Sequence, residues 1–458
     1  MSFQRIRTFD NVAKPFVRLV EKCYPDAFIF VIILSILTYF LAITIAGASH
    51  AEAITAWGEG LPKLFTFTAQ ITLIMVGAHA LAHTEPIENA LYRIGSIPRS
   101  SLHAYALVTF CSGCASLVAW SLGLIVGGIV SKYVALGCLK KKIKVHYPLL
   151  VASAYSGYVI WHMGYSSSSA LFVSTPGHML EDKIGVLPVT ETIFSSFDIF
   201  LALFTLIIIT IINPLMKPKD DEVIEIKKGV IKKETKKGNN LDINQNNKSI
   251  LYLIENKRYF SSFLGFVILF YIFLTYYLNG FFLTLSFVSF TFLGVGLLLA
   301  NSPMHFVKLT NNAAKTVGPI ILQYPFYAGI MGIMGNTELL NVIADWITSI
   351  STKETLGFYS FLSAGIVNMF IPSGGGQWAV QGPVMIEAAN ALNVDPRIIV
   401  LSVSYGDQWT NMIQPFWTIP LLAIAGLHMR QIMGYTFVIF IITGIIYGSG
   451  VIYMGYTG

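Results

Sequence analysis

Long apolar runs separated by shorter polar stretches form the dominant pattern of the chain. A helix needs about 20 consecutive apolar residues to cross the hydrocarbon layer of a membrane. The pattern predicts membrane segments over 26–47, 61–83, 103–135, 148–175, 193–215, 260–278, 282–300, 313–335, 357–390, 397–425 and 431–453. Three of them, 103–135, 148–175 and 357–390, are too long for one simple span and contain internal Gly, Ser or Pro residues. We therefore expect these three segments to be interrupted inside the membrane.

The composition excludes the soluble classes of protein. Of the 458 residues, 54% are hydrophobic and only 12% are charged, whereas a soluble domain usually carries about 25% charged residues. The mean hydropathy is +0.65, so there is too little polar surface to cover a soluble body. A cytoplasmic enzyme, a nucleic-acid-binding protein and a disordered scaffold are ruled out. The lipid bilayer is the predicted partner, and no nucleic acid is expected.

The charged residues between the apolar runs predict the topology, because cytoplasmic loops are enriched in Lys and Arg. Basic residues make 1–25 an amphipathic cytoplasmic segment, while 48–60 has Glu but no Lys or Arg and is predicted to lie outside. The Lys-rich and Asn-rich residues 216–258 form a predicted cytoplasmic linker. Basic residues flank 103–135 on both sides, which predicts a re-entrant hairpin, with two very short spans as the alternative. By the same reasoning 357–390 enters and leaves from the outside, and the C-terminus ends outside.

Two parts of the chain resemble each other. Residues 77–85 resemble 329–338, and residues 153–157 resemble 402–406. The membrane part therefore divides into a first repeat at 26–215, a connecting span at 259–281 and a second repeat at 282–458. If the hairpins do not cross, an odd number of crossings separates the two copies, so the second copy is inverted. Inverted repeats with interrupted helices are typical of secondary transporters; the alternative is two ordinary bundles whose similarity arises by chance.

The segment 372–378 is the clearest candidate binding site. Pro372 lacks a backbone donor and ends a helix, the glycines that follow can adopt positive φ, and Ser373 can cap a new helix that begins near Gln377. Such a tip presents free N–H groups and the positive end of a helix dipole, which together bind an anion. A glycine packing kink is the alternative. The predicted substrate-binding residues here are Ser373, Gly374, Gly375, Gly376, Gln377 and Trp378.

The first repeat has a matching tip and a matching break. The tip, residues 119–123, contains Ser121 as a candidate for substrate binding, although small-residue helix packing explains it almost as well. The break at 161–169 contributes Ser166 to the same candidate site. His162 lies in this break and can carry a proton near neutral pH, with a hydrogen-bonded structural histidine as the alternative.

The segment 405–417 is a second candidate site, because it places an acid inside a membrane run. An intramembrane Asp is a functional candidate by default, although a structural ion at a wet interface is the alternative. We expect the segment to be unwound, so that side-chain and carbonyl oxygens can hold Na⁺ or a proton. The predicted cation-coupling residues are Asp407, Thr410, Asn411, Gln414 and His162.

No motif predicts an enzyme, a bound metal or an organic cofactor. Cys111 and Cys114 form a C-x-x-C pair without the second pair that a structural zinc site needs, and His79 and His83 lack a third ligand. No P-loop or nucleophile elbow is present. The ions expected to act are H⁺ or Na⁺ as coupling ions.

The distribution of arginines and aromatic residues limits the substrate. All arginines lie in loops or at span edges, whereas a dicarboxylate would favour a bidentate Arg clamp inside the site. The candidate segments instead offer hydroxyls, amides and backbone N–H groups. Aromatic residues accompany them: Trp161, Trp378, Trp409, Phe416 and Trp417. This combination favours a substrate with one carboxylate and a short apolar tail.

The chain resembles the short-chain fatty acid transporter family. The resemblance is carried by 323–329, 371–378, 381–383 and 405–417, and it extends from Tyr24 to the C-terminus. It implies uptake of acetoacetate, butyrate or similar acids across the bacterial inner membrane. It also implies a relationship to the wider superfamily of hairpin-containing, often dimeric ion transporters. The chain departs from the family pattern at Asp407, where the family more often has Glu. It also departs at the first hairpin and at the serine run 166–169, where the family is more glycine-rich.

The sequence therefore predicts an all-α polytopic membrane protein with two inverted repeats, each with a re-entrant hairpin and a discontinuous helix, plus one connecting span. We expect a secondary active transporter for short-chain monocarboxylates, coupled to H⁺ or Na⁺. The expected location is the bacterial inner membrane, with a cytoplasmic N-terminus and a periplasmic C-terminus, and a homodimer is a further expectation. Two alternatives stay open: a carrier of C4-dicarboxylates or amino acids, and an uncoupled anion channel.

Overall fold

The computed structural model describes residues 27–226, 250–280, 285–314 and 317–457, and these ranges are built from helices without any strand. The predicted segment 1–25 and the linker residues 227–249 lie outside this description. Six helical stretches of the described residues are long and apolar enough to cross a membrane, judged by length and composition: His50–Ala82, Ser101–Val118, Trp120–Lys140, Ser196–Leu215, Arg258–Leu278 and Met429–Thr457. The predicted all-α polytopic fold class is confirmed.

The helices before the linker are α2 (Ala27–Thr44), α3 (His50–Gly60), η2 (Leu61–Leu64), α4 (Phe65–Ala82), α5 (Glu85–Gly95), α6 (Ser101–Val118), α7 (Trp120–Lys140), α8 (Tyr147–Ser156), η3 (Gly157–Met163), α9 (Ser168–Val173), α10 (Glu181–Ile184), η4 (Val189–Glu191) and α11 (Ser196–Leu215). Those after it are α12 (Ile250–Asn256), α13 (Arg258–Asn279), α14 (Leu285–Leu299), α15 (Pro303–Ala314), α16 (Gly318–Asn336), α17 (Leu339–Ser349), α18 (Leu356–Asn368), α19 (Gly374–Leu392), α20 (Pro396–Thr410), η6 (Asn411–Ile413), α21 (Thr418–Ala425) and α22 (Met429–Thr457). Elements named η are 3-10 helices.

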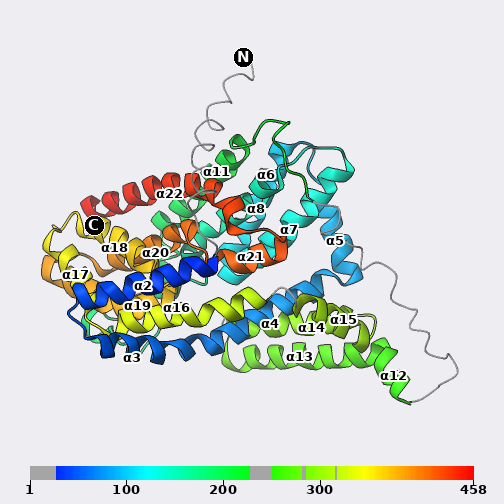
Figure 1. Cartoon of the computed structure of the whole chain (residues 1–458), viewed down its shortest axis with the longest axis horizontal. Helices are drawn as coiled ribbons and strands as arrows, with labels where there is room; N and C mark the ends of the chain where they lie inside the picture. Colours follow the sequence, from blue (N-terminus) through cyan, green and yellow to red (C-terminus); the bar gives the residue numbers. More distant parts are fainter. Residues whose placement is uncertain (1–26, 227–249, 281–284, 315–316, 458) are drawn as a thin grey trace.

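One part of the molecule, which we call the frame, consists of α2, α3, α4, α13, α14 and α16. Helix α3 continues through η2 into α4, α16 packs against α2 and α3, and α14 packs against α13 and α4 (Figure 1). Helices α3 and α16 touch backbone to backbone, because a Cβ on Gly332 of α16 would overlap the carbonyl oxygen of Ala56. Small residues allow such close crossings in membranes.

The other part, which we call the bundle, carries both hairpins and both broken helices. Helix α6 packs against α7, α8, η3 and α11, and α18 packs against α20 and α22. Every residue of α8 and η3 is buried. The bundle therefore places the first broken helix in the interior of the protein.

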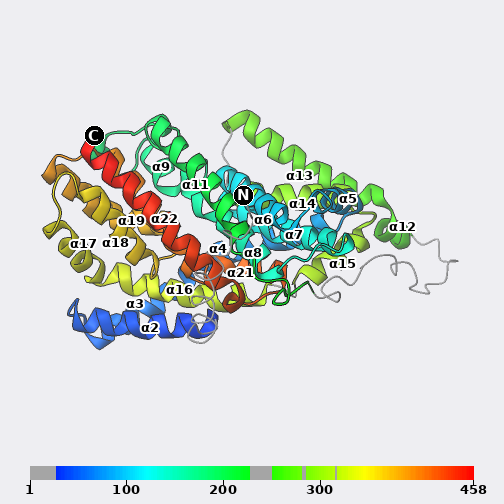
Figure 2. The ribbon, with the colours of Figure 1, turned by 90° about the horizontal axis from the view of Figure 1, so that it is seen from above.

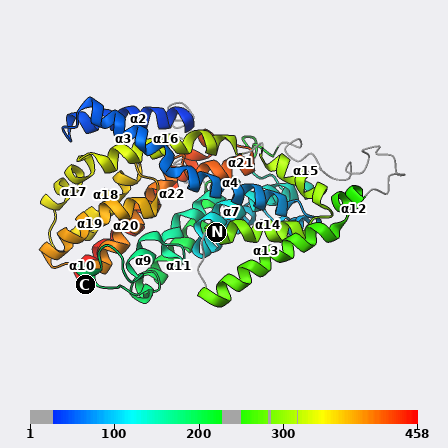
Figure 3. The same ribbon diagram turned by 90° about the horizontal axis from the view of Figure 1, so that it is seen from below.

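The loops that were used to predict the topology lie at the two ends of the molecule. Helices α5, α12 and α15 lie at one end of the long axis, and α17 and the C-terminus lie at the other (Figures 1, 2 and 3). The Lys-rich turn after α7 belongs to the α5 end, because Gly137 of α7 packs against Gly95 of α5. Glu338, Asp345 and Glu354 belong to the α17 end. Which end faces the cytoplasm stays a prediction.

All three segments that were expected to be interrupted are interrupted. Segment 103–135 divides at Ala119, which has extended backbone between α6 and α7. Segment 148–175 changes from α8 to η3 and reaches an extended residue at Gly164. Segment 357–390 is broken between Asn368 and Gly374.

Two local predictions are wrong. The membrane segment expected over 61–83 begins earlier, because residues 48–60 contain α3, whose start is fixed by a capping box between Ser49 and Glu52; that 48–60 lie outside stays a prediction. The segment 405–417 is unwound only in its second half, so Asp407 lies within α20. The reason is Pro415: it cannot donate a backbone hydrogen bond, and the extended backbone begins just before it at Gln414.

The same order of elements occurs in both halves of the chain. A long helix, a short amphipathic helix, a helical hairpin, a broken helix and a final long helix appear as α4 to α11 and again as α16 to α22. The arms of the first hairpin have 18 and 21 residues, so they are not very short spans. The inversion of one half relative to the other stays a prediction.

Candidate functional site

The tip of the second hairpin starts a helix on glycines. Ser373 is the N-cap of α19, and its Oγ accepts a hydrogen bond from the Gly376 backbone N–H at 3.3 Å. The predicted cap is confirmed, but α19 begins at Gly374 and not near Gln377. None of the three glycines has a positive φ, so the tip does not use the conformational freedom that glycine permits. The chain reverses instead through Met369–Ser373, in which Ser373 has extended backbone.

Two backbone N–H groups at this tip have no hydrogen-bond acceptor among the described residues. The N–H groups of Gly376 and Gln377 both donate to Ser373, the second to its carbonyl oxygen at 2.7 Å. Within the part of the chain that the structure describes, the N–H groups of Gly374 and Gly375 have no acceptor. These donors lie at the positive end of the α19 dipole, which is the arrangement that binds an anion.

The second hairpin meets the break of the first repeat at Gly374. A Cβ on Gly374 would lie 2.5 Å from His162 Nε2 and 2.8 Å from Trp161 Cη2. A Cβ on Gly375 would have Ser168 Cβ, at 3.8 Å, as its nearest neighbour. Glycine at position 374 therefore permits the close approach of the His162 ring to the first turn of α19, whereas position 375 has free space around it.

His162 is held by two hydrogen bonds, and its second ring nitrogen has no hydrogen-bond partner among the described residues. Its backbone N–H donates to Gln408 Oε1 at 2.9 Å, and its Nδ1 lies 3.1 Å from Ser167 Oγ. Its Nε2 has no hydrogen-bond partner within the described residues and lies 3.7 Å from Asp407 Oδ2. The histidine is 1% exposed, so Nε2 faces the interior between the α19 tip and Asp407.

Asp407 is a buried acid without hydrogen-bond donors. It is 1% exposed, and neither carboxylate oxygen accepts a hydrogen bond from a residue that the structure describes. No Lys or Arg of the described residues lies within ion-pair distance of it. An unpaired carboxylate costs several kcal/mol in such surroundings. The position therefore requires a proton or a cation.

Asn368, at the end of α18, joins the hairpin to the second break. Its Oδ1 accepts hydrogen bonds from Thr410 Oγ1 at 3.1 Å and from Gln414 Nε2, and its Nδ2 donates to Gln377 Oε1 at 3.2 Å. Gln414 Nε2 also donates to Asn411 Oδ1 at 2.6 Å. The structure thus brings together three of the predicted cation-coupling residues with the predicted tip residue Gln377. Gln414 Oε1 and Asn411 Nδ2 have no partner in the described chain.

The side chains of Gln377 and Trp378 lie inside the second hairpin. Gln377 Nε2 donates to Ala364 O and to Gln381 Oε1, both at 2.9 Å, so its whole amide is engaged inside the protein. Trp378 is 1% exposed and lies against the backbone of Gly382 one turn further along α19. Both side chains brace the second hairpin.

The first hairpin tip meets both breaks. The N–H of Trp120 donates to Ser166 Oγ at 2.8 Å, and the Trp120 ring packs on Trp417 with centroids 4.8 Å apart. Ser166 therefore caps α7. Ser121 is buried in the first turn of α7. The candidate residues of the first repeat thus lie next to the second break, as those of the second hairpin lie next to the first.

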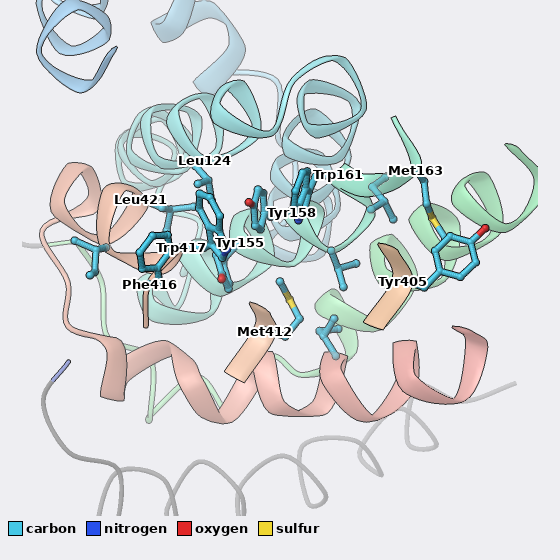
Figure 4. Packing of buried hydrophobic residues seen from close by; sticks show 14 of the residues in the cluster. Leu124, Tyr155, Tyr158, Trp161, Met163, Tyr405, Met412, Phe416, Trp417 and Leu421 are labelled. Atoms are coloured by element: carbon cyan, nitrogen blue, oxygen red, sulfur yellow. The ribbon is translucent and has the colours of Figure 1, made fainter. Parts of the chain in front are cut away.

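A wall of stacked aromatic rings borders the same region (Figure 4). Tyr155, Tyr158 and Trp161 stack in succession along α8 and η3, with centroids 5.9 and 5.8 Å apart. Trp417 packs against Tyr158 and against Phe416. The wall supplies an apolar surface beside His162, which follows Trp161 in the chain.

Sequence reasoning missed two polar residues. Asn368 precedes the Pro-Ser-Gly run and was treated only as part of that segment, although its position at a helix end was a usable signal. Asp198 in α11 is fully buried and accepts a hydrogen bond from Tyr405 Oη of α20 at 2.6 Å. The rule applied to Asp407, that an acid in a membrane run is notable, would also have found Asp198.

No group of three or more His, Cys, Asp or Glu side chains that could hold a metal occurs in the described ranges. His79 and His83 stack on each other with centroids 4.3 Å apart, and Cys111 and Cys114 are free thiols.

Comparison with known proteins gives consistent results over nearly the whole chain. The family model described as "Short chain fatty acid transporter" matches residues 8–454. A protein of Escherichia coli is 33% identical over 96% of this chain and 98% of its own length, and one of Haemophilus influenzae is 33% identical over 97% and 99%. Both carry the name "Putative short-chain fatty acid transporter".

Two solved transporter structures are similar at low level. The YdaH transporter of Alcanivorax borkumensis aligns with 94% of this chain and 98% of its own, at 13% identity and a TM-score of 0.44. MtrF of Neisseria gonorrhoeae, from a class described as antimetabolite efflux pumps, covers 97% of both chains at 13% identity and a TM-score of 0.36. At these values neither likeness assigns a substrate or a site.

A multi-pass helical fold whose hairpin tips meet two broken helices around buried polar atoms defines the class of membrane transporters. Within that class, the chain belongs to the short-chain fatty acid transporter family.

Proposed function

We propose that the protein is a secondary active transporter that takes up short-chain monocarboxylates of the acetoacetate and butyrate type. The observation that carries the proposal is the meeting of the α19 tip with His162 and Asp407, since it combines free donors with a buried acid that requires a cation. The family membership supports the substrate class. The proposed location is the bacterial inner membrane, with the N-terminus inside, and a homodimer is compatible with the proposal.

The substrate's carboxylate binds at the first turn of α19. The free N–H groups of Gly374 and Gly375 point to this position, and Ser373 keeps the turn in place by capping it. Gly376 allows close packing of the tip against the frame, because a Cβ there would lie 3.1 Å from Met331 Cε of α16. Gln377 and Trp378 act as positioning residues, and Ser121 and Ser166 position the opposite tip.

The aromatic wall receives the substrate's tail. Each CH₂ group that is buried there contributes about 0.8 kcal/mol, so a tail of a few carbons adds usefully to binding. A dicarboxylate would instead bring a second charge against Tyr158, Trp161 or Trp417. Arg397 cannot clamp a second carboxylate in the site, because it is half-exposed and already pairs with Asp395 and Glu191.

The coupling cation binds between the second hairpin and the second break. Asp407 supplies the charge, and the amide and hydroxyl groups of Thr410, Asn411 and Gln414 connect this position to the hairpin through Asn368. Because His162 and Asp407 are almost fully buried, substrate and cation reach them only when the tip moves. Movement of the tip with both ligands bound is the basis of coupling in this proposal.

Uptake by purified protein in proteoliposomes tests the proposal. Labelled butyrate should accumulate above its external concentration when an inward H⁺ or Na⁺ gradient is imposed, and unlabelled acetoacetate should compete while succinate and lysine should not. Preference for succinate or an amino acid would assign a different substrate class. Flux that never exceeds equilibrium under any gradient would assign a channel.

A further inference from the structure

An anion at the α19 tip is stabilised by a positive partner, and the described structure brings one basic side chain to the tip at Gly374, which is buried although Gly375 beside it is exposed. His162 Nε2 lies 2.5 Å from the Cβ position of Gly374, which places the ring edge against the turn with the free N–H groups. The lysines and arginines in the described ion pairs, Lys183, Lys217 and Arg397, are all at least partly exposed and pair with surface acids. A carboxylate at the tip therefore lies within reach of His162 Nε2.

His162 has one position open for a ligand. Its backbone N–H and its Nδ1 are occupied by Gln408 and Ser167, and these contacts fix the ring. Its Nε2 has no hydrogen-bond partner in the described chain, and the 3.7 Å to Asp407 Oδ2 is longer than a hydrogen bond. The ring edge with Nε2 thus faces both the tip and Asp407. A proton on Nε2 can therefore be donated in a hydrogen bond either to an anion at the tip or to Asp407.

Charge balance then determines what must accompany the substrate. With one proton shared, the empty pair of His162 and Asp407 has no net charge. A substrate carboxylate that binds to protonated His162 adds a negative charge to the site. His162 then compensates the substrate, and the charge of Asp407 is left uncompensated. Removing one partner of a buried ion pair is strongly destabilising, because it leaves an uncompensated buried charge. The loaded site avoids this cost if Asp407 takes a proton from solution.

We propose that protonated His162 is the cationic partner of the substrate's carboxylate, and that Asp407 takes up the proton that accompanies the substrate. Transport is then an electroneutral symport of one monocarboxylate with one proton. In the empty site Asp407 is ionised and pairs with His162; in the loaded site Asp407 is neutral and His162 pairs with the substrate. This inference rests on the proposed function and specifies its coupling ion.

The surroundings of Asp407 favour a proton over Na⁺. A hard cation needs several oxygen ligands, whereas Asp407 faces a ring nitrogen at 3.7 Å, and that nitrogen repels Na⁺ whenever it is protonated. Among the described residues, Tyr158 of η3 is a further titratable group that interacts electrostatically with Asp407. Asp198 of α11 is paired with Tyr405 and belongs to the opposite side of α20. No described acid other than Asp407 competes for His162.

Isothermal titration of the purified full-length protein in detergent measures this proton directly. Potassium butyrate is titrated into sodium-free solutions at one pH, in two buffers with different heats of ionisation. The difference in apparent binding heat gives the number of protons taken up for each butyrate bound. We expect one proton for the wild-type protein, and binding should be unchanged by added Na⁺.

Three variants assign the proton and the anion partner. Asp407→Asn removes the proposed proton acceptor, and by the same charge balance the proton that accompanies butyrate should then bind to His162. The infrared band of a newly protonated carboxyl group, which butyrate carrying an isotope-labelled carboxylate should add to the difference spectrum of the wild-type protein, should therefore be absent from Asp407→Asn. His162→Gln keeps a polar side chain without the charge and should weaken butyrate binding by more than tenfold. Asp198→Asn is the matched control, because it removes a buried carboxyl outside the site and should leave uptake of one proton intact.

Each other result overturns a defined part of the inference. Butyrate binding without proton uptake, or only with Na⁺, overturns proton coupling and leaves the proposed function standing. Persistence of that carboxyl band in Asp407→Asn overturns the role of Asp407. Butyrate affinity within a few-fold of wild type in His162→Gln overturns the role of His162. A monodisperse wild-type protein that binds no butyrate at all overturns both this inference and the proposed function.

Discussion

Single residues at the α19 tip differ in what an added side chain would meet, and this difference makes a sharp test. Gly374→Ala would place a Cβ 2.5 Å from His162 Nε2 and 2.8 Å from Trp161. Such overpacking costs about 1–3 kcal/mol and moves the ring, so butyrate uptake should fall by at least tenfold. Gly335→Ala in α16 is the control, because a Cβ there has no neighbour within 4 Å. Equal uptake by the two variants would show that transport does not depend on the contact between His162 and the tip.

Asn368 is a second residue with a measurable role, because three hydrogen bonds converge on its amide. Asn368→Ala leaves Gln414 and Gln377 with unsatisfied buried groups, each worth about 1–3 kcal/mol. The unfolding temperature in detergent should fall, and uptake should fall with it. The exposed Asn390 of α19 provides the control Asn390→Ala, which should do neither. A normal unfolding temperature in Asn368→Ala would show that the amide network contributes nothing to stability.

The same residues show what a sequence can and cannot predict. Pro372 and Ser373 act locally, through a missing donor and a cap, so the hairpin break and the N-cap followed from residue type. The backbone of the three glycines did not, because glycine permits positive φ without requiring it, and helical packing against His162 decided the conformation. The Asn368 network joins residues up to 46 positions apart, and only the folded chain brings these together.

At the scale of elements, α11 and α20 are joined by one buried hydrogen bond. Tyr405 Oη donates to Asp198 Oδ1 at 2.6 Å, and Asp198 Oδ2 has no partner within the described residues. Tyr405→Phe removes the only hydrogen bond that the structure gives to this carboxyl group. We expect a loss of about 1–3 kcal/mol in the free energy of unfolding, seen as a lower unfolding temperature. Tyr456→Phe, at a residue that is 71% exposed, should have no effect, and the proposal of a stabilising bond fails if the two variants unfold alike.

Element boundaries followed from the sequence where hydrophobic runs were long and differed where a helix carried polar residues. Helix α3 was missed because residues 48–60 are less apolar than the runs on either side and their acidic residues were read only for topology, whereas the capping box at Ser49 and Glu52 starts a helix. Asp407 was expected in an unwound segment, but the residues from Pro396 to Thr410 continue as helix because no proline interrupts them. Polar side chains inside a bundle are compatible with helix, since their partners come from neighbouring elements.

At the scale of the whole molecule, the distribution of charge predicts which end faces the cytoplasm. Lys144 follows α7 at the end that includes α5, and Lys353 lies next to α17 at the opposite end; both are exposed. Gly137, which is also close to the first end, is unsuitable for labelling because it packs against the backbone of Gly95. Exposed lysines at the two ends therefore offer a pair of reporter positions that should not disturb the fold.

The orientation is tested by single cysteines at these two positions, after Cys23, Cys111, Cys114 and Cys138 are replaced by serine. The positive-inside rule places the Lys-rich end in the cytoplasm. Lys353→Cys should then react with a membrane-impermeant maleimide in intact spheroplasts, while Lys144→Cys should react only after lysis. The reverse result would invert the molecule in the membrane. Labelling of both cysteines in intact spheroplasts would place both ends of the molecule on the same side of the membrane. The two hairpins would then not enter from opposite sides, and the predicted inversion of the second repeat would be wrong.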